Sequence, residues 1–234
     1  MLKNNDGFRC ALPILPLLVM GSLFAFDALA EPTFLMARQV DESFDVKGLQ
    51  EIWFAIHDIN GGVPYDGAEK WYLSKTNLSA PRDGYGSRLI HGNFDPYEIA
   101  FLRGGKLSEG LLEVATNPES GHTNVSASKE IAFRGRRYKL VVQPVLLKTD
   151  GSNMPVRNDV YFSDGKSRTL LYGGDGSGQS SDDPFFVWAG DVDRDGEPDF
   201  IVHFFDDDNE KGRDCVFLSS AAKKGELVRN AGCE

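Results

Sequence analysis

The chain has 234 residues, of which 41% are hydrophobic and 26% are charged, and its formal net charge at pH 7 is −10. The negative charge is concentrated between residues 182 and 210, where eleven acidic residues accompany one basic residue, Arg194. Nucleic-acid binding needs a basic surface that neutralises phosphates, so this distribution argues against a nucleic-acid partner. A local excess of carboxylates instead predicts that one region of the chain binds cations.

Residues 1–30 have the features of a secretory signal peptide. Two basic residues precede an apolar run from Ala11 to Phe26, and Ala28-Leu29-Ala30 matches the cleavage pattern of such peptides. The run is short and contains two prolines, which disfavours a membrane span, although a retained anchor is the alternative. We therefore expect a secreted or periplasmic chain of residues 31–234 that forms a single β domain.

Short segments rich in β-branched and aromatic residues predict strands along most of the chain. In the first of them, residues 51–58, Ile52, Phe54 and Ile56 recur with a period of two and are expected on one side of a strand. Residues 70–73 fit its return strand, and a helix over residues 68–75 is the competing expectation. Two hairpins are expected at 129–147 and 159–172, and further strands at 97–102, 111–115, 185–190, 200–205, 214–219 and 226–228.

About ten short strands separated by frequent turns are typical of an all-β fold. We expect an antiparallel sandwich or a partly open barrel that contains one strand–calcium loop–strand unit at residues 184–205.

The calcium loop is predicted from the spacing of its carboxylates. Aspartates occupy loop positions 1, 3, 5 and 9, and Gly196 at position 6 permits a sharp turn. Ca²⁺ takes six to eight oxygen ligands in a flexible shell, and a position-7 backbone carbonyl is one of its usual ligands. Without a cation, two carboxylates about 4 Å apart repel by roughly 4 kcal/mol at an effective dielectric constant of about 20. The predicted ligands of Ca²⁺ are Asp191, Asp193, Asp195, the carbonyl of Glu197, and Asp199.

The flanks of the loop distinguish it from an EF-hand. An EF-hand has a bidentate Glu at position 12, where this chain has Val202, and it has helices where this chain has expected strands. From Gly190 to Asp199 the segment resembles an FG-GAP-type (integrin-like) repeat, with the signature Gly-Asp-x-Asp-x-Asp-Gly-x-x-Asp. The resemblance implies that the four Asp side chains and a position-7 carbonyl bind Ca²⁺. No second copy of the signature occurs, so a full propeller is not expected.

Two cysteines, Cys215 and Cys233, remain once residues 1–30 are removed. An exported pair of cysteines tends to be oxidised. Cys215 begins an expected strand and Cys233 lies next to the end of the chain, so a bridge would hold the terminal segment in place. We predict a Cys215–Cys233 disulfide.

Motifs of catalysis are weak in this chain. The histidines have no zinc-binding spacing, and no Gly-x-Ser-x-Gly motif is present. His91 lies in an expected polar loop and is a candidate functional residue. The acidic run 206–210 is either a solvated turn, or a second, weaker cation site or a contact for a basic partner.

The leading hypothesis is an exported calcium-binding β domain with a structural or binding role and without catalytic activity. One alternative is an extracytoplasmic hydrolase of glycans or phosphoesters that uses acidic residues, with His91 as a further candidate. The other is a calcium-dependent adhesion module with a protein or glycan partner.

Overall fold

The structure, a computed structural model, describes residues 33–37, 39–40, 49–58, 70–81, 88–93, 98–118, 128–149, 152–173, 184–206 and 209–233. These residues form sixteen strands and no α-helix, which confirms the all-β prediction. The predicted signal peptide lies outside the described residues. Within them, no helix has the length and apolar character needed to cross a membrane.

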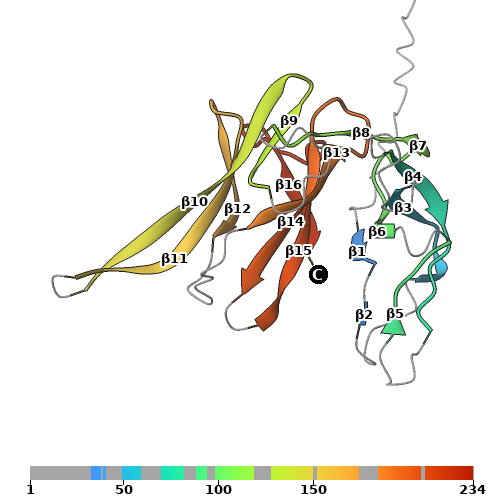
Figure 1. Ribbon diagram of the computed structural model, residues 1–234, viewed down its shortest axis with the longest axis horizontal. Coiled ribbons are helices and arrows are strands. Elements are labelled where there is room, and N and C mark those ends of the chain that lie inside the picture. The colour runs from blue at the N-terminus through green and yellow to red at the C-terminus, as the bar shows by residue number, and fades with distance from the viewer. Residues whose placement is uncertain are drawn as a thin grey trace, which may run out of the picture.

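Most of the strands belong to three antiparallel sheets, and none of the sheets closes into a barrel (Figure 1). The first sheet has the order β1 (Thr33–Met36), β6 (Glu98–Arg103), β3 (Trp53–Asp58), β4 (Trp71–Thr76), β7 (Gly110–Leu111). The hairpin sheet has the order β12 (Arg168–Gly173), β11 (Ser152–Ser163), β10 (Arg136–Thr149), β9 (Glu130–Phe133). The central sheet has the order β16 (Arg229–Cys233), β15 (Asn209–Leu218), β14 (Asp199–Asp206), β13 (Phe185–Asp191), β8 (Glu113–Val114). Strands β2 (Gln39–Val40) and β5 (Arg88–Leu89) form a separate two-stranded ribbon.

The central sheet is covered on both sides, with the hairpin sheet on one side and the first sheet on the other (Figure 1). Strand β14 shows this alternation. Phe200 and Val202 pack into a core shared with the hairpin sheet, whereas Ile201 packs into a core shared with the first sheet. Strands buried on both faces are continuous apolar runs rather than alternating ones, and this accounts for the sequence from Phe200 to Phe205.

The first sheet also has apolar residues on both faces, and this alters one expectation. Ile56 lies in the core shared with the central sheet, while Trp53 and Ala55 belong to a smaller cluster on the opposite face. Ile52 precedes β3 and is 62% exposed. The expectation that Ile52, Phe54 and Ile56 lie on one side of a strand is therefore only partly right. The period of two is weak evidence for one buried side where both faces are covered. The segment that fitted helix or strand is a strand, β4.

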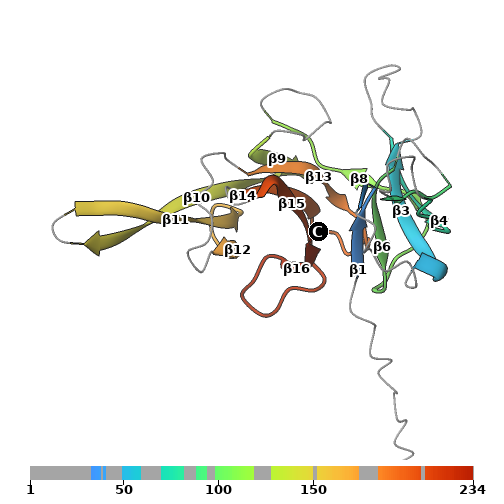
Figure 2. The ribbon, with the colours of Figure 1, turned by 90° about the horizontal axis from the view of Figure 1, so that it is seen from below.

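The two predicted hairpins are present, but β10 and β11 are longer than expected. They pair from Lys139–Ser163 to Thr149–Ser152, and the register shifts between Val145 and Leu146. Pro155 lies next to that irregularity, and prolines in sheets are tolerated at bulges, although in a sequence they argue against a strand. Beyond β9 and β12 the hairpin extends away from the body of the molecule (Figures 1 and 2).

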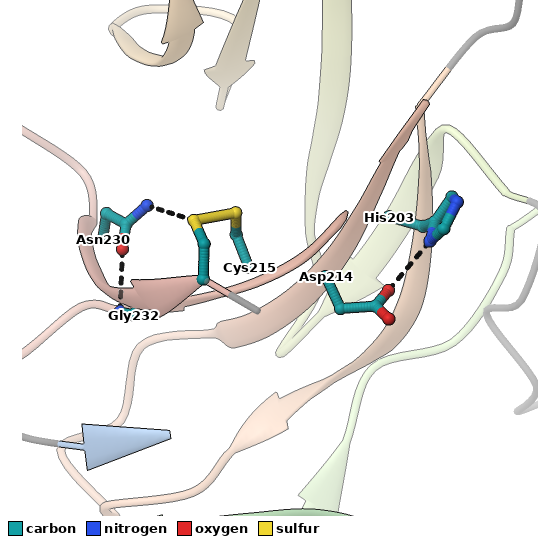
Figure 3. The surroundings of a disulfide bond; sticks show 6 residues. His203, Asp214, Cys215, Asn230 and Gly232 are labelled. Carbon is teal, nitrogen blue, oxygen red and sulfur yellow. Dashed lines mark hydrogen bonds and ion pairs between the residues drawn. A yellow bond between two sulfur atoms is a disulfide. The ribbon is translucent and has the colours of Figure 1, made fainter. Parts of the chain in front are cut away.

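The predicted disulfide is present at the edge of the central sheet. Cys215 and Cys233 are register partners of β15 and β16, and their sulfur atoms lie 2.00 Å apart. The Asn230 side chain donates from Nδ2 to Cys233 Sγ at 3.0 Å and accepts the Gly232 N–H at 2.7 Å (Figure 3). The disulfide therefore joins β15 to a segment of β16 that is held by its own local hydrogen bonds.

Candidate metal centre

The acidic loop connects β13 to β14, as the sequence predicted for a strand–loop–strand unit. Asp191 is the last residue of β13 and Asp199 is the first of β14. The side chains of Asp191, Asp193 and Asp195 each offer one oxygen, and these oxygens all lie within 4.8 Å of one another. Three of the predicted ligands are thus brought together at one point.

Backbone amides wrap this turn around the Asp191 carboxylate. Asp191 Oδ1 accepts the Asp195 N–H at 3.0 Å, and Oδ2 accepts the Gly196 N–H at 3.0 Å. Gly196 has a φ of 94°, a conformation that glycine adopts without steric cost. The Asp195 N–H also lies 3.3 Å from Asp193 Oδ1. The turn is therefore organised by the same carboxylates that are candidate ligands.

Asp199, the predicted position-9 ligand, lies outside that group of oxygens and anchors the loop. Its side chain is buried, with 1% of the residue exposed. Oδ2 accepts the Val192 N–H at 2.8 Å, and Oδ1 accepts the Ser219 N–H at 2.8 Å. The Ser219 hydroxyl lies 2.9 Å from Asp199 Oδ1 and 2.9 Å from Asp195 Oδ2, and its single proton serves one of them at a time. Asp199 thus links both ends of the loop to the end of β15.

The Glu197 side chain points to the hairpin sheet. It is paired with Arg136, and the Tyr138 hydroxyl donates to it at 3.4 Å. The sequence assigned the backbone carbonyl of Glu197, not this carboxylate, to the metal. The two assignments are compatible, because the side chain is engaged elsewhere.

All three sheets contact the loop through polar side chains. Arg134, in the turn between β9 and β10, holds Glu113 by two nitrogens at 2.6 to 3.0 Å and lies 3.5 Å from Asp191 Oδ2. Arg194, in the loop itself, donates to the carbonyls of Ser108 and Glu109 at 3.4 and 3.1 Å, just before β7 of the first sheet. Ser219 and Ser220 follow β15 of the central sheet, and the Ser220 hydroxyl donates to Asp193.

The pKa values of the loop carboxyls are shifted upward by their surroundings. Burial raises the pKa of Asp191 and of Asp193, and neighbouring aspartates raise both further. Burial also raises the pKa of Asp199 well above its ordinary value, with the charge of Asp193 adding to the effect. Because each of these groups resists carrying a negative charge, a bound cation would relieve an unfavourable arrangement.

Four residues that matter for this site were not found from the sequence: Arg134, Arg194, Ser219 and Ser220. Each is a common surface residue without a local motif. Ser219 and Ser220 lie twenty or more positions from the aspartates they contact, and Arg134 lies more than fifty positions from Asp191. The pairing of β14 with β15 brings Ser219 and Ser220 to the loop. The packing of the hairpin sheet brings Arg134 to it.

The histidines that the structure describes do not contribute to this centre. Among the described residues, His57 lies 2.9 Å from Ser74, His91 lies 3.1 Å from Ser79, and His203 Nδ1 lies 3.0 Å from an oxygen of Asp214 (Figure 3). His122 lies outside the described residues. In the acidic run 206–210, residues 207–208 also lie outside them, so its proposed cation site stays a prediction.

Comparisons of the chain with protein-family models, with curated proteins and with solved structures found no match.

Proposed function

We propose that this chain is an exported β domain in which Ca²⁺ binds the β13–β14 loop and stabilises the packing of the three sheets. The observation that carries the proposal is the convergence of Asp191, Asp193 and Asp195, with ligand oxygens within 4.8 Å, in a loop that contacts all three sheets. A cation that orders this loop also orders the polar contacts that the loop makes with the three sheets. The role proposed for this calcium loop is structural or binding rather than catalytic.

The donor set favours calcium over other common ions. All the candidate side-chain ligands are carboxylates, and hard oxygen donors suit Ca²⁺ and Mg²⁺ rather than zinc. Mg²⁺ demands near-ideal octahedral geometry at short distances, whereas Ca²⁺ accepts a larger and more irregular shell that water completes. The Glu197 carbonyl and Asp199 are the further ligands that the FG-GAP resemblance implies, and they belong to this proposal.

Export is part of the same proposal. The signal-peptide pattern supports it, and the Cys215–Cys233 pair is compatible with an oxidising compartment. Extracellular calcium modules commonly have dissociation constants of about 10⁻⁴ to 10⁻³ M, which suits the calcium concentration outside cells.

Replacing Asp193 with alanine is expected to abolish the response of thermal stability to calcium. A ligand that binds only the folded state adds about 2.7 kcal/mol at one hundred times its Kd. For a domain of this size, that corresponds to a rise in Tm of roughly 5–10 °C. Differential scanning calorimetry of the unaltered protein and Asp193→Ala, each with calcium and with chelator, measures the difference.

Asp164→Ala is the matched control, because Asp164 is a partly exposed aspartate that accepts the N–H groups of Lys166 and Ser167 in another turn. It should keep the full calcium response. A melting curve of the unaltered protein that is indifferent to chelator, with no calcium binding by calorimetry at millimolar concentrations, contradicts the proposal. A hydrolytic activity that is lost in a folded Asp193→Ala variant would favour the catalytic alternative instead.

Calcium affinity is expected to fall as the pH is lowered from 7 to 5. Metal binding requires the carboxylate form, and burial raises the pKa of Asp191 and Asp193 toward the tested range. The raised pKa means that protons compete with calcium at a higher pH than they would at an ordinary aspartate. Isothermal titration calorimetry should show a higher Kd at pH 5 than at pH 7. Equal affinity at the two pH values would show that these carboxyls are not the ligands.

A further inference from the structure

An open cavity of about 550 Å³ lies beside the first sheet, in a size range typical of small-molecule sites. Apolar residues make most of its wall, and Leu78 and Ala80 also pack against the buried cluster that includes Trp53 and Ile90. The wall is therefore anchored in the fold. The described lining residues are Leu49, Gln50, Leu78, Ser79, Ala80, Pro81 and His91.

Ser79 and His91 form a hydrogen-bonded pair in this lining. They are partners in an isolated antiparallel bridge, and Ser79 Oγ lies 3.1 Å from His91 Nε2. His91 Nδ1 lies 3.4 Å from the Gly92 carbonyl oxygen, which can only accept a hydrogen bond. In neutral His91, the proton on Nδ1 therefore leaves Nε2 as the acceptor for the Ser79 hydroxyl. This is the arrangement in which a histidine serves as the base for a serine nucleophile.

Buried side chains of the first sheet hold the backbone beside His91 through hydrogen bonds. Glu98, which is 8% exposed, accepts the Gly92 N–H at 2.8 Å, and Thr76 Oγ1 accepts the Asn93 N–H at 2.9 Å. A Cβ on Gly92 would lie 2.3 Å from Thr76 Oγ1 and 2.5 Å from Glu98 Oε1, so this close approach requires glycine. The carbonyl that orients the imidazole is thus held in place, and a positioned base is what general-base catalysis requires.

We propose that Ser79 and His91 hydrolyse a neutral carboxylic ester whose acyl group is apolar. The apolar wall suits the acyl group, and the described lining residues include no lysine or arginine that would select a charged phosphoester or carboxylate substrate. This activity goes beyond the calcium-stabilised role and uses none of its residues. Strand β5, which precedes His91, lies at the end of the molecule opposite β8 and the acidic loop (Figure 1).

The reaction balances with water as the second substrate. Ser79 Oγ attacks the ester carbonyl carbon while its proton moves to His91 Nε2. The tetrahedral intermediate then expels the alcohol, which takes that proton from His91, and an acyl-serine ester remains. A water molecule loses a proton to His91 and attacks the acyl carbon. Ser79 leaves with the proton, and the carboxylic acid is released.

The chain contains a second Ser–His pair that serves as an internal comparison. His57 Nε2 lies 2.9 Å from Ser74 Oγ, but His57 is 5% exposed and neither residue lines the cavity. If a hydrogen-bonded serine and histidine were sufficient, both serines would react. If the cavity is also required, Ser79 alone reacts.

The test is covalent labelling of the folded protein in calcium with a fluorophosphonate probe, followed by peptide mass spectrometry, together with the hydrolysis rate of p-nitrophenyl butyrate. We expect an adduct on Ser79 that is absent from Ser79→Ala. Hydrolysis by Ser79→Ala should fall to the rate in buffer, and that by His91→Gln by about 100-fold. Ser74→Ala should keep both the adduct and the rate. Thermal melting checks that each variant is folded.

Three results would overturn the inference. The first is the absence of both adduct and hydrolysis in the unaltered protein. The second is an adduct on another serine, or labelling of Ser74 as well as Ser79. The third is hydrolysis that persists in Ser79→Ala but is lost in His91→Gln, which would mean direct catalysis by the imidazole without a serine nucleophile.

Discussion

Asp199→Ala is expected to lower the free energy of unfolding by about 4 kcal/mol, even in the presence of chelator. The substitution leaves the N–H groups of Val192 and Ser219 without their acceptor, whereas the Ser219 hydroxyl keeps Asp195 Oδ2 as an acceptor. A buried donor without a partner costs about 1–3 kcal/mol. Because Val192 and Asp199 are each about 1% exposed, water has little access to replace the lost bonds at that end of the loop.

Asp193→Ala is the matched comparison, since it removes a carboxylate from the same loop at a less buried position. In chelator it should lose less than about 1 kcal/mol, because water can satisfy the partners that Asp193 leaves behind. Calcium should add the larger loss to Asp193→Ala, which removes one of the three converging ligands, whereas Asp199→Ala leaves those three in place and removes only the further ligand that the resemblance implies. Denaturant unfolding of each variant, in calcium and in chelator, gives the four free energies of unfolding to compare. Equal losses for both variants in chelator would show that Asp199 is no more of an anchor than Asp193.

Asp199→Asn refines this result. Asparagine keeps the shape and one acceptor oxygen but places an NH₂ donor where the second oxygen was. That donor would meet either the Val192 N–H or the Ser219 N–H, so about half of the alanine effect should remain. Full recovery of stability would mean that the negative charge and the second acceptor are unimportant, and that the anchoring interpretation is wrong.

The sequence predicted the fold class and the position of the acidic loop because both depend on local patterns. Apolar strands and turn residues are recognisable within a few positions, and the Asp-x-Asp-x-Asp-Gly spacing is specific for a loop that gathers carboxylates. The Cys215–Cys233 pair was predictable because few cysteines are present. What each aspartate contacts was not predictable in the same way.

The role of Asp199 shows why. In the sequence it is the fourth member of a ligand series, and in the structure its two oxygens accept bonds from Val192 and from Ser219 at the end of another strand. That contact depends on the register of β14 with β15, in which Phe200 is opposite Phe217. Register is set by the packing of whole sheets. The Ser79–His91 pair was missed for the same reason, because an isolated bridge brings together two residues that no motif connects.

Loss of the Cys215–Cys233 disulfide is expected to lower stability by about 3 kcal/mol, which is a fall in Tm of roughly 6–12 °C. The cysteines are 18 positions apart in the sequence, and cross-linking a loop of this length restricts the unfolded chain by about that amount in the chain-entropy model. Cys233→Ser is the suitable variant. Cys215 is 2% exposed and packs in the core shared with the hairpin sheet, so it should be left in place.

The loss should extend beyond the end of the chain, because β16 also contacts the first sheet. Gly232 lies beside Phe34 of β1, and Ala231 packs against the core that Phe34 shares with the central sheet. Hydrogen exchange should therefore increase in β1 as well as in β16 in Cys233→Ser. Reductant should lower the Tm of the unaltered protein to that of Cys233→Ser and leave the variant unchanged. Alkylation of both cysteines in the folded, unreduced protein would show that the bridge is absent, whereas exchange confined to β16 would show that β1 is held without it.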